Sequence, residues 1–171
     1  AEGAFAHALR VGQPLVALMI DVDHFKQIND VHGHAVGDRV LADLAWSCRE
    51  QVRQSDIAGR YGGDEFIIIL PGATSQRAAQ VAAQLTAAPA RVTGNDARLV
   101  AFTVSVGIAE SARCADLPGL LARADVAMYE AKRAGGGCWR VIDDAAQGAV
   151  SGPSGHIVPG VAARPAGGPG R

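Results

Sequence analysis

Apolar positions along the chain change their period several times, and these changes predict the order of helices and strands. The segment "PLVALMIDVD" (14–23) is apolar almost without a break until Asp21, which predicts a buried strand. The segment 24–33 predicts a short helix that ends at Gly33. The segment 37–53 predicts a long amphipathic helix with its apolar residues on one face.

The second half of the chain alternates short strands with helices. The segment "DIAGRYGGDEFIIIL" (56–70) predicts two strands, and Gly62-Gly63 between them is typical of a type I′ hairpin turn. In "LVAFTVSVGIAE" (99–110) apolar and polar or small residues alternate, which predicts one strand. The other expected elements are a helix end over 2–10, a helix from Thr74 or Ser75 to about Ala88, a helix capped by Asp116 that runs to about Ala134, and an edge strand over 139–142.

This order of elements predicts an α+β domain of two layers. A mostly antiparallel central sheet would be flanked by helices that pack against one face. We expect the domain to occupy residues 1–143. The Gly- and Pro-rich segment 144–171 shows almost no periodicity, and we expect it to be a disordered tail.

Composition and charge narrow the function. The 171 residues carry a net charge of −1, so no basic surface for nucleic acid is expected. The longest apolar run, 15–20, is too short to cross a bilayer, so we expect no membrane span in this segment. Three cysteines without metal-ligand spacing favour a reduced compartment, and we expect a cytoplasmic protein.

Two clusters of carboxylates are candidates for chemistry. Asp21 and Asp23 end the first strand on the same face, and Asp64 and Glu65 lie at the hairpin. If the hairpin lies beside the first strand, hard oxygen ligands from both places meet and predict a Mg²⁺ site completed by water and substrate phosphate. The helix that starts after Asp23 would offer unpaired N–H groups to a phosphate, with Lys26 adding positive charge.

Simpler interpretations exist for each cluster alone. Asp21 could bond to the start of the next helix, and Asp64-Glu65 could be a solvated turn. The combination with Lys26 and the adjacent Gly62 and Gly63, which leave the backbone open to a bulky ligand, favours a nucleotide site.

Several ordered segments carry a family resemblance. "RYGGDEF" is the signature of the GGDEF domains, the diguanylate cyclases, and four further segments resemble the family in the same order: "MIDVDHFKQIND", "GHAVGD", "TVSVGIA" and "ADVAMYEAK". The match runs from about Pro14 to Val141. It implies a sheet surrounded by helices, similar to polymerase palms and adenylyl cyclases. It also implies that two GTP molecules condense to cyclic di-GMP and two pyrophosphates across a homodimer.

The resemblance assigns metal and catalytic roles. Asp21, the carbonyl of Val22 and Asp64 would hold Mg²⁺, two ions per active site, with Mn²⁺ as an alternative ion. Asp64 would accept the proton of the attacking hydroxyl, Glu65 would be the second signature acid, and Lys26 would stabilise charge on the reacting phosphates.

The resemblance also assigns residues that bind the nucleotide. Asn29 and Asp38 would contact guanine, the amides of Phe25 and Lys26 would cradle phosphate, and Lys132 would reach the triphosphate. From the residues alone, Asn29 could be a polar residue at a helix end, Asp38 a helix N-cap, and Lys132 a solvated lysine of the last turn.

A second site is implied by "RQSD" (53–56). Five residues separate Asp56 from Gly62, which is the family's spacing for an inhibitory site that binds the product cyclic di-GMP. Arg53 would offer a bidentate fork to phosphate or guanine, and Asp56 would accept from guanine. The simpler interpretation is a surface ion pair.

The chain departs from the family pattern at three places. The opening Asp-x-Leu-Thr turn is missing, so we expect an N-terminally truncated domain with a sensor or membrane domain upstream. Gly136 stands where the family usually has arginine in Gly-Arg-Asn, and Gln84 stands where a helix arginine often completes the inhibitory site. The missing start and Gly136 keep open a GGDEF module that binds GTP or cyclic di-GMP without catalysis. A palm-type polymerase or another nucleotide cyclase is a separate alternative, and the absence of a basic groove argues against a template-bound polymerase.

Overall fold

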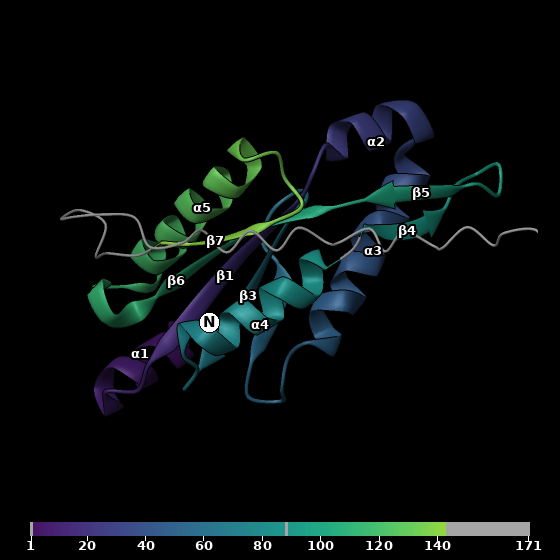
Figure 1. Ribbon diagram of the computed structural model, residues 1–171. Coiled ribbons are helices and arrows are strands. Elements are labelled where there is room, and N and C mark those ends of the chain that lie inside the picture. Colours follow the sequence, from purple (N-terminus) through teal and green to yellow (C-terminus); the bar gives the residue numbers. More distant parts are fainter. Residues whose placement is uncertain (1, 88, 143–171) are drawn as a thin grey trace, which may run out of the picture.

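The computed structural model describes residues 2–87 and 89–142, and Figure 1 shows their arrangement. The predicted tail over 144–171 lies outside the described residues. The elements follow in the order α1 (Glu2–Val11), β1 (Leu15–Val22), α2 (Phe25–His32), α3 (His34–Glu50), β2 (Ile57–Arg60), β3 (Glu65–Pro71), α4 (Ser75–Thr86), β4 (Ala90–Thr93), β5 (Leu99–Phe102), β6 (Val104–Glu110), a 3₁₀ turn (Ser111–Arg113), α5 (Leu117–Arg133) and β7 (Trp139–Val141).

The central sheet has five strands in the order β2-β3-β1-β6-β7. Strand β1 pairs antiparallel with both β3 and β6, β2 pairs antiparallel with β3, and β7 adds to β6 in parallel. The prediction of a mostly antiparallel sheet flanked by helices is therefore confirmed. β1 is the middle strand, and all eight of its residues are buried, as its continuous apolar run predicted.

Helices cover both faces of the sheet, so the expected arrangement of two layers with helices on one face is wrong. Alternate residues of β1, among them Val16, Leu18 and Ile20, pack with apolar residues of α3 and α4. The residues between them, among them Ala17 and Met19, pack with α1 and α5. A middle strand that is apolar on both sides requires cover on both sides.

The segment 99–110 also differs from the single strand expected. It breaks at Thr103 into β5, which pairs with β4 in a separate two-stranded sheet, and β6, which joins the central sheet. The expected alternation is nevertheless correct, because the side chains of Phe102, Val104, Val106 and Ile108 all belong to one core. Figure 1 shows the β4–β5 arm extending away from the central sheet beside α2 and α3.

Local signals place several helix ends. α2 ends at Gly33, which has a φ of 83°, and the Asp116 carboxylate accepts a hydrogen bond from the Gly119 amide at 2.8 Å at the start of α5. α3 begins at His34, three residues earlier than the expected start at Gly37. No helix in the described part of the chain is long and apolar enough to span a membrane.

Gly107 sets the distance between α5 and the sheet. A Cβ added to Gly107 would lie 2.0 Å from the carbonyl oxygen of Ala124 and 2.2 Å from the amide nitrogen of Met128, both backbone atoms of α5. The helix can approach β6 this closely because position 107 has no side chain.

We predict that Gly107→Ala lowers the free energy of unfolding by about 3 kcal/mol, because α5 has to move away from the sheet. Urea denaturation measures the change. Gly59→Ala on the edge strand β2 is the matched control, since nothing lies within 4 Å of a Cβ there. Equal stability of the two variants would contradict this account of the α5 contact.

Candidate active site

The two carboxylate clusters meet at one end of the central sheet. Asp21, near the end of β1, lies opposite Glu65 of β3 and opposite Ser105 of β6. Asp64 directly precedes Glu65 at the end of the hairpin turn. The expectation that the hairpin lies beside the Asp21 strand is therefore confirmed, with β3 as the strand that pairs with β1. Asp21 is only 5% exposed, whereas Asp64 and Glu65 are partly exposed.

Burial dominates the electrostatics of Asp21. Burial is the largest cause that raises the pKa of this carboxyl from 3.8 to about 6, and the negative charges of Asp64 and Glu65 act in the same direction. The Lys132 ammonium acts in the opposite direction, since Nζ lies 2.6 Å from Oδ1 of Asp21. Lys132 is thus in an ion pair at the carboxylate, and its interpretation as a solvated lysine is wrong.

The hairpin turn is longer than expected. The amides of Tyr61 and Gly62 both donate to the Glu65 carbonyl, at 2.8 and 3.3 Å, and neither Gly62 nor Gly63 has a positive φ. A type I′ turn requires positive φ at both central residues, so that prediction is wrong. The two glycines also differ: a Cβ on Gly62 would lie 2.5 Å from Oε2 of Glu65, whereas nothing lies within 4 Å at Gly63.

Arg60 holds this turn in place, and this role was not predicted from the sequence. Its Nε donates to the carbonyls of Gly62 and Gly63, both at 3.1 Å, and its Nη2 also donates to Gly63. These bonds fix the backbone directly before Asp64. The signal available in the sequence was the arginine that opens "RYGGDEF", because it lies only two and three residues before the glycines whose carbonyls it binds.

α2 starts just after the end of β1, four residues beyond Asp21. Phe25 and Lys26 are its first two residues, and His24 before them has a left-handed backbone with φ 56°. The first N–H groups of a helix have no partner within the helix and favour an anion. Lys26 is exposed and can turn toward a ligand there.

Asn29 and Asp38 are brought together where α2 packs on α3. A Cβ on Gly37 would lie 2.0 Å from Oδ1 of Asn29, so the glycine before Asp38 allows the close approach. Within the part of the chain that the structure describes, the buried Asn29 Oδ1 has no hydrogen-bond partner. Asp38 lies inside α3, whose N-cap is Gly33, so its interpretation as an N-cap is wrong.

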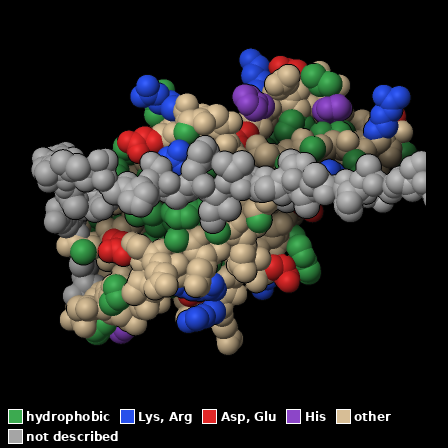
Figure 2. All heavy atoms as spheres, viewed as in Figure 1, with side chains coloured by type: hydrophobic (Ala, Val, Ile, Leu, Met, Phe, Trp, Pro, Cys, Tyr) green, Lys and Arg blue, Asp and Glu red, His purple; other side chains and the backbone are tan. Residues whose placement is uncertain are grey.

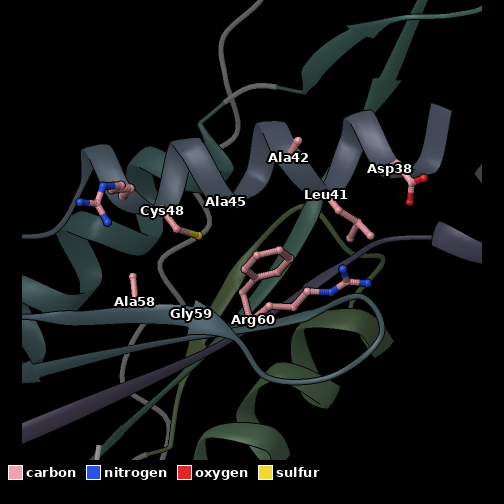
Figure 3. Close-up of a pocket in the computed structure, with 10 residues that line it drawn as sticks. Asp38, Leu41, Ala42, Ala45, Cys48, Ala58, Gly59 and Arg60 are labelled. Atoms are coloured by element: carbon pink, nitrogen blue, oxygen red, sulfur yellow. The ribbon is translucent and has the colours of Figure 1, made fainter. Parts of the chain in front are cut away.

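A cavity of about 520 Å³ opens beside Asp38, between α3 and β2. Leu41, Ala42 and Ala45 line it from α3, and Ala58 and Gly59 from β2. Figure 3 shows Asp38 and the Arg60 side chain on opposite sides of this cavity. The cavity is thus mostly apolar along its length, with Asp38 and Arg60 near one end and Arg49 also in its lining, eleven residues after Asp38 on α3.

Arg53 and Asp56 form a turn between α3 and β2. The Arg53 amide donates to Oδ2 of Asp56 at 2.8 Å, and the Asp56 amide donates to the Arg53 carbonyl at 3.0 Å. The Arg53 side chain is exposed, and both residues line a cavity of about 450 Å³ with Arg49. Gln84 on α4 lines a different cavity, beside Trp46 and Gln51.

The donor set at the carboxylates fits Mg²⁺. In the described residues, no group of three or more His, Cys, Asp and Glu side chains could hold a metal by itself. Mg²⁺ usually takes only one or two carboxylates and fills its other positions with water and substrate phosphate. Asp21 and Asp64 supply such oxygens, and a buried carboxylate whose pKa is raised to about 6 gains from a nearby cation.

Comparison with known proteins agrees with this geometry. The family model described as "Diguanylate cyclase, GGDEF domain" matches residues 1–138. The chain belongs to the GGDEF domain family. Diguanylate cyclase TpbB of Pseudomonas aeruginosa is 42% identical over 151 residues, which cover 83% of this chain and 34% of TpbB. Diguanylate cyclase DosC of Escherichia coli is 39% identical over 132 residues, 76% of this chain and 29% of DosC.

Solved structures of GGDEF domains share the fold. The GGDEF domain of TpbB superposes with a TM-score of 0.76 at 39% identity and covers 83% of this chain and 90% of that domain. The GGDEF domain of DgcB from Caulobacter crescentus, solved in complex with c-di-GMP, gives a TM-score of 0.74 at 29% identity over 82% of both chains. The chain spans about a third of the length of the curated relatives.

We predict that Lys132→Met raises the pKa of the Asp21 carboxyl above about 6, because the ion pair that lowers it is lost while burial remains. A titration of the side-chain carboxyl carbons followed by NMR measures the shift. Lys26→Met is the matched control, since Lys26 is not among the groups that shift Asp21. An unchanged pKa in Lys132→Met would contradict the ion pair.

Proposed function

We propose that this domain condenses two GTP molecules to cyclic di-GMP and two pyrophosphates. The observation that carries the proposal is the meeting of Asp21 with the Asp64-Glu65 turn, near the end of β1 from which the chain enters α2. This arrangement offers oxygen ligands near the end of β1, a helix start that can bind an anion, and the exposed Lys26 in the first turn of that helix. The names of the relatives as diguanylate cyclases support the choice of reaction.

The metal would be held by Asp21, the Val22 carbonyl and Asp64. We propose two Mg²⁺ ions per active site, with Mn²⁺ as an alternative. Bound there, the ions would supply Lewis-acid stabilisation for the attacking and leaving oxygens. Asp21 and Val22 are fixed by the middle strand, and Asp64 is fixed by the turn that Arg60 holds.

The nucleotide would extend from the carboxylates toward α3. The amides of Phe25 and Lys26 would bind phosphate oxygens, and Gly63 leaves the turn open for a close approach. Asn29 and Asp38 would bind guanine, since Asp38 can accept from the base and the Asn29 oxygen is without a partner in the described residues. Lys132 would leave Asp21 to bind the triphosphate.

The reaction needs two protomers, each with one GTP. The ribose 3′-oxygen of one GTP forms a bond to the α-phosphorus of the other, the bond from that phosphorus to the bridging oxygen breaks, and pyrophosphate leaves. Asp64 would accept the proton of the 3′-hydroxyl, with Glu65 beside it, and Lys26 would stabilise the charge on the phosphate. A second such step closes the ring, so we propose a homodimer as the active form.

Two further assignments accompany this function. Arg53 and Asp56 would bind cyclic di-GMP as an inhibitory product, since the exposed guanidinium and the carboxylate line one cavity. We also infer a cytoplasmic location, where GTP is available, and control by an upstream sensor domain. A GGDEF module that binds GTP or cyclic di-GMP without turnover is the second candidate, and the glycine at position 136 is the observation that favours it.

We predict that the wild-type domain forms cyclic di-GMP from GTP and Mg²⁺, detected by mass spectrometry, and that Asp64→Asn lowers turnover at least 100-fold, roughly the loss of one acid–base and metal ligand. The fold should remain, because Asp64 is partly exposed in the turn. Asp125→Asn, an exposed aspartate on α5, is the control. No product from folded, dimeric wild-type protein would favour the binding module instead.

We predict that Arg53→Ala raises the cyclic di-GMP concentration needed for half inhibition about tenfold, because a charge-assisted contact to phosphate is lost. The initial rate without product should change less than about twofold. Initial rates at increasing cyclic di-GMP measure both. Arg98→Ala, in the β4–β5 turn, is the matched control. If Arg53→Ala and wild type are inhibited equally, the turn is no product site.

A further inference from the structure

Asp23 has a different role from Asp21, although the two lie together at the end of β1. Asp23 is 7% exposed and accepts hydrogen bonds on both carboxylate oxygens. Ser105 Oγ donates to Oδ1, while Thr103 Oγ1 and the Gly137 amide donate to Oδ2, each at 2.7 Å. Charge-assisted bonds of this length are strong, so the carboxylate is committed to the protein and is not a free metal ligand.

The loop after α5 wraps closely around this carboxylate. Gly135, Gly136 and Gly137 all have positive φ, at 112°, 74° and 60°. A Cβ on Gly136 would lie 2.8 Å from Cγ of Asp23. Three glycines in left-handed conformations therefore allow the loop to follow the surface of Asp23, which a side chain at position 136 would prevent.

This loop is joined directly to the turn of α5 that carries Lys132. The Gly135 amide donates to the Lys132 carbonyl at 3.1 Å, and the Gly136 amide donates to the Ala131 carbonyl at 3.2 Å. The end of α5 is thus attached to the end of β1 at two points. One is the Lys132 ion pair with Asp21, and the other is the Gly137 bond to Asp23.

We propose that Asp23 is a positioning residue for the triphosphate of GTP and that it acts through Lys132. The inference rests on the proposed function, in which Lys132 leaves Asp21 to bind the nucleotide. When that ion pair opens, the bonds to Asp23 still hold the end of α5. They fix the Cα of Lys132, so that its long side chain reaches the phosphates without the loop having to be ordered first.

A double-mutant cycle tests this coupling. We would measure the Kd of a GTP analogue with a methylene group between the α- and β-phosphorus atoms, in Mg²⁺, for wild type, Asp23→Asn, Lys132→Met and the double variant. Asn presents one acceptor oxygen and an NH₂ group, which cannot accept from Gly137 or from the hydroxyls. Loss of a negative charge alone would tighten binding of an anion. Weaker binding by Asp23→Asn would therefore indicate that Lys132 is no longer held in position.

The expected result is that Asp23→Asn weakens binding about tenfold in the wild-type background and less than about twofold in Lys132→Met. Unchanged binding by Asp23→Asn, or equal weakening in both backgrounds, would overturn the inference. If wild type fails to bind the analogue, the proposed function falls and this inference with it. If wild type binds and the cycle is additive, only the inference falls.

A second pair of variants separates position from stability. Ser105→Ala removes one donor to Asp23, and Ser111→Ala removes a buried hydroxyl that accepts from the Leu15 amide at the other end of β1. Thermal unfolding should detect both changes, whereas only Ser105→Ala should weaken the analogue, by about threefold, and only while Lys132 is present. This pair replaces Asp23→Asn if that variant does not fold, and equal binding by the two serine variants would overturn the inference.

Discussion

The middle strand of the sheet carries a carboxylate into a part of the molecule that is largely shielded from water. β1 is buried along its whole length, with α3 and α4 on one face and α1 and α5 on the other. Asp21 near its end is therefore desolvated, and the pKa of its carboxyl is raised to about 6. A nearby cation favours the charged form of this buried carboxylate. In the structure this cation is Lys132, and in the proposed reaction Mg²⁺ takes that place.

Two glycine contacts position other groups of the candidate site. Gly107 lets α5 approach β6, which brings Lys132 over the sheet, and Gly37 lets α2 approach α3, which brings Asn29 beside Asp38. At Gly107 the helix backbone lies closer to the sheet than a Cβ would allow, whereas at Gly37 the space of a Cβ is taken by the Asn29 side chain. The candidate site therefore depends on backbone distances set away from it, and not only on the residues that would contact the nucleotide.

Local sequence patterns correctly predicted the features of the fold that depend on residues close together in the sequence. The buried β1, the end of α2 at Gly33 and the cap at Asp116 all follow from short-range signals. The break at Thr103 could not be predicted in the same way, because alternation continues through it while the chain changes sheet. Cover on both faces could have been inferred, since a strand apolar on both sides requires it.

The candidate site was also predicted only in part from the sequence. Spacing and signature placed Asp21, Asp64 and Glu65 together, as the register between β1 and β3 has them. The roles of Arg60 and Asp23 were missed, because each acts on backbone groups: Arg60 on the carbonyls of the turn, and Asp23 on the Gly137 amide. A motif identifies side chains that contact a ligand, but it does not show which side chains hold the backbone around them.

The glycine at position 136 affects both the side chains that would contact the nucleotide and the side chains that hold the backbone around them. With φ 74° and the Asp23 carboxylate 2.8 Å from where its Cβ would be, the loop in this conformation has no place for the arginine usual in the family. The lost cation would have contributed charge to the phosphate site, whereas the glycine allows a close contact that holds the end of α5. In the proposed function, charge at this end of the site would therefore depend more heavily on Lys132. A long lysine side chain is a mobile point charge, so its effect on a phosphate depends on how well its backbone is held.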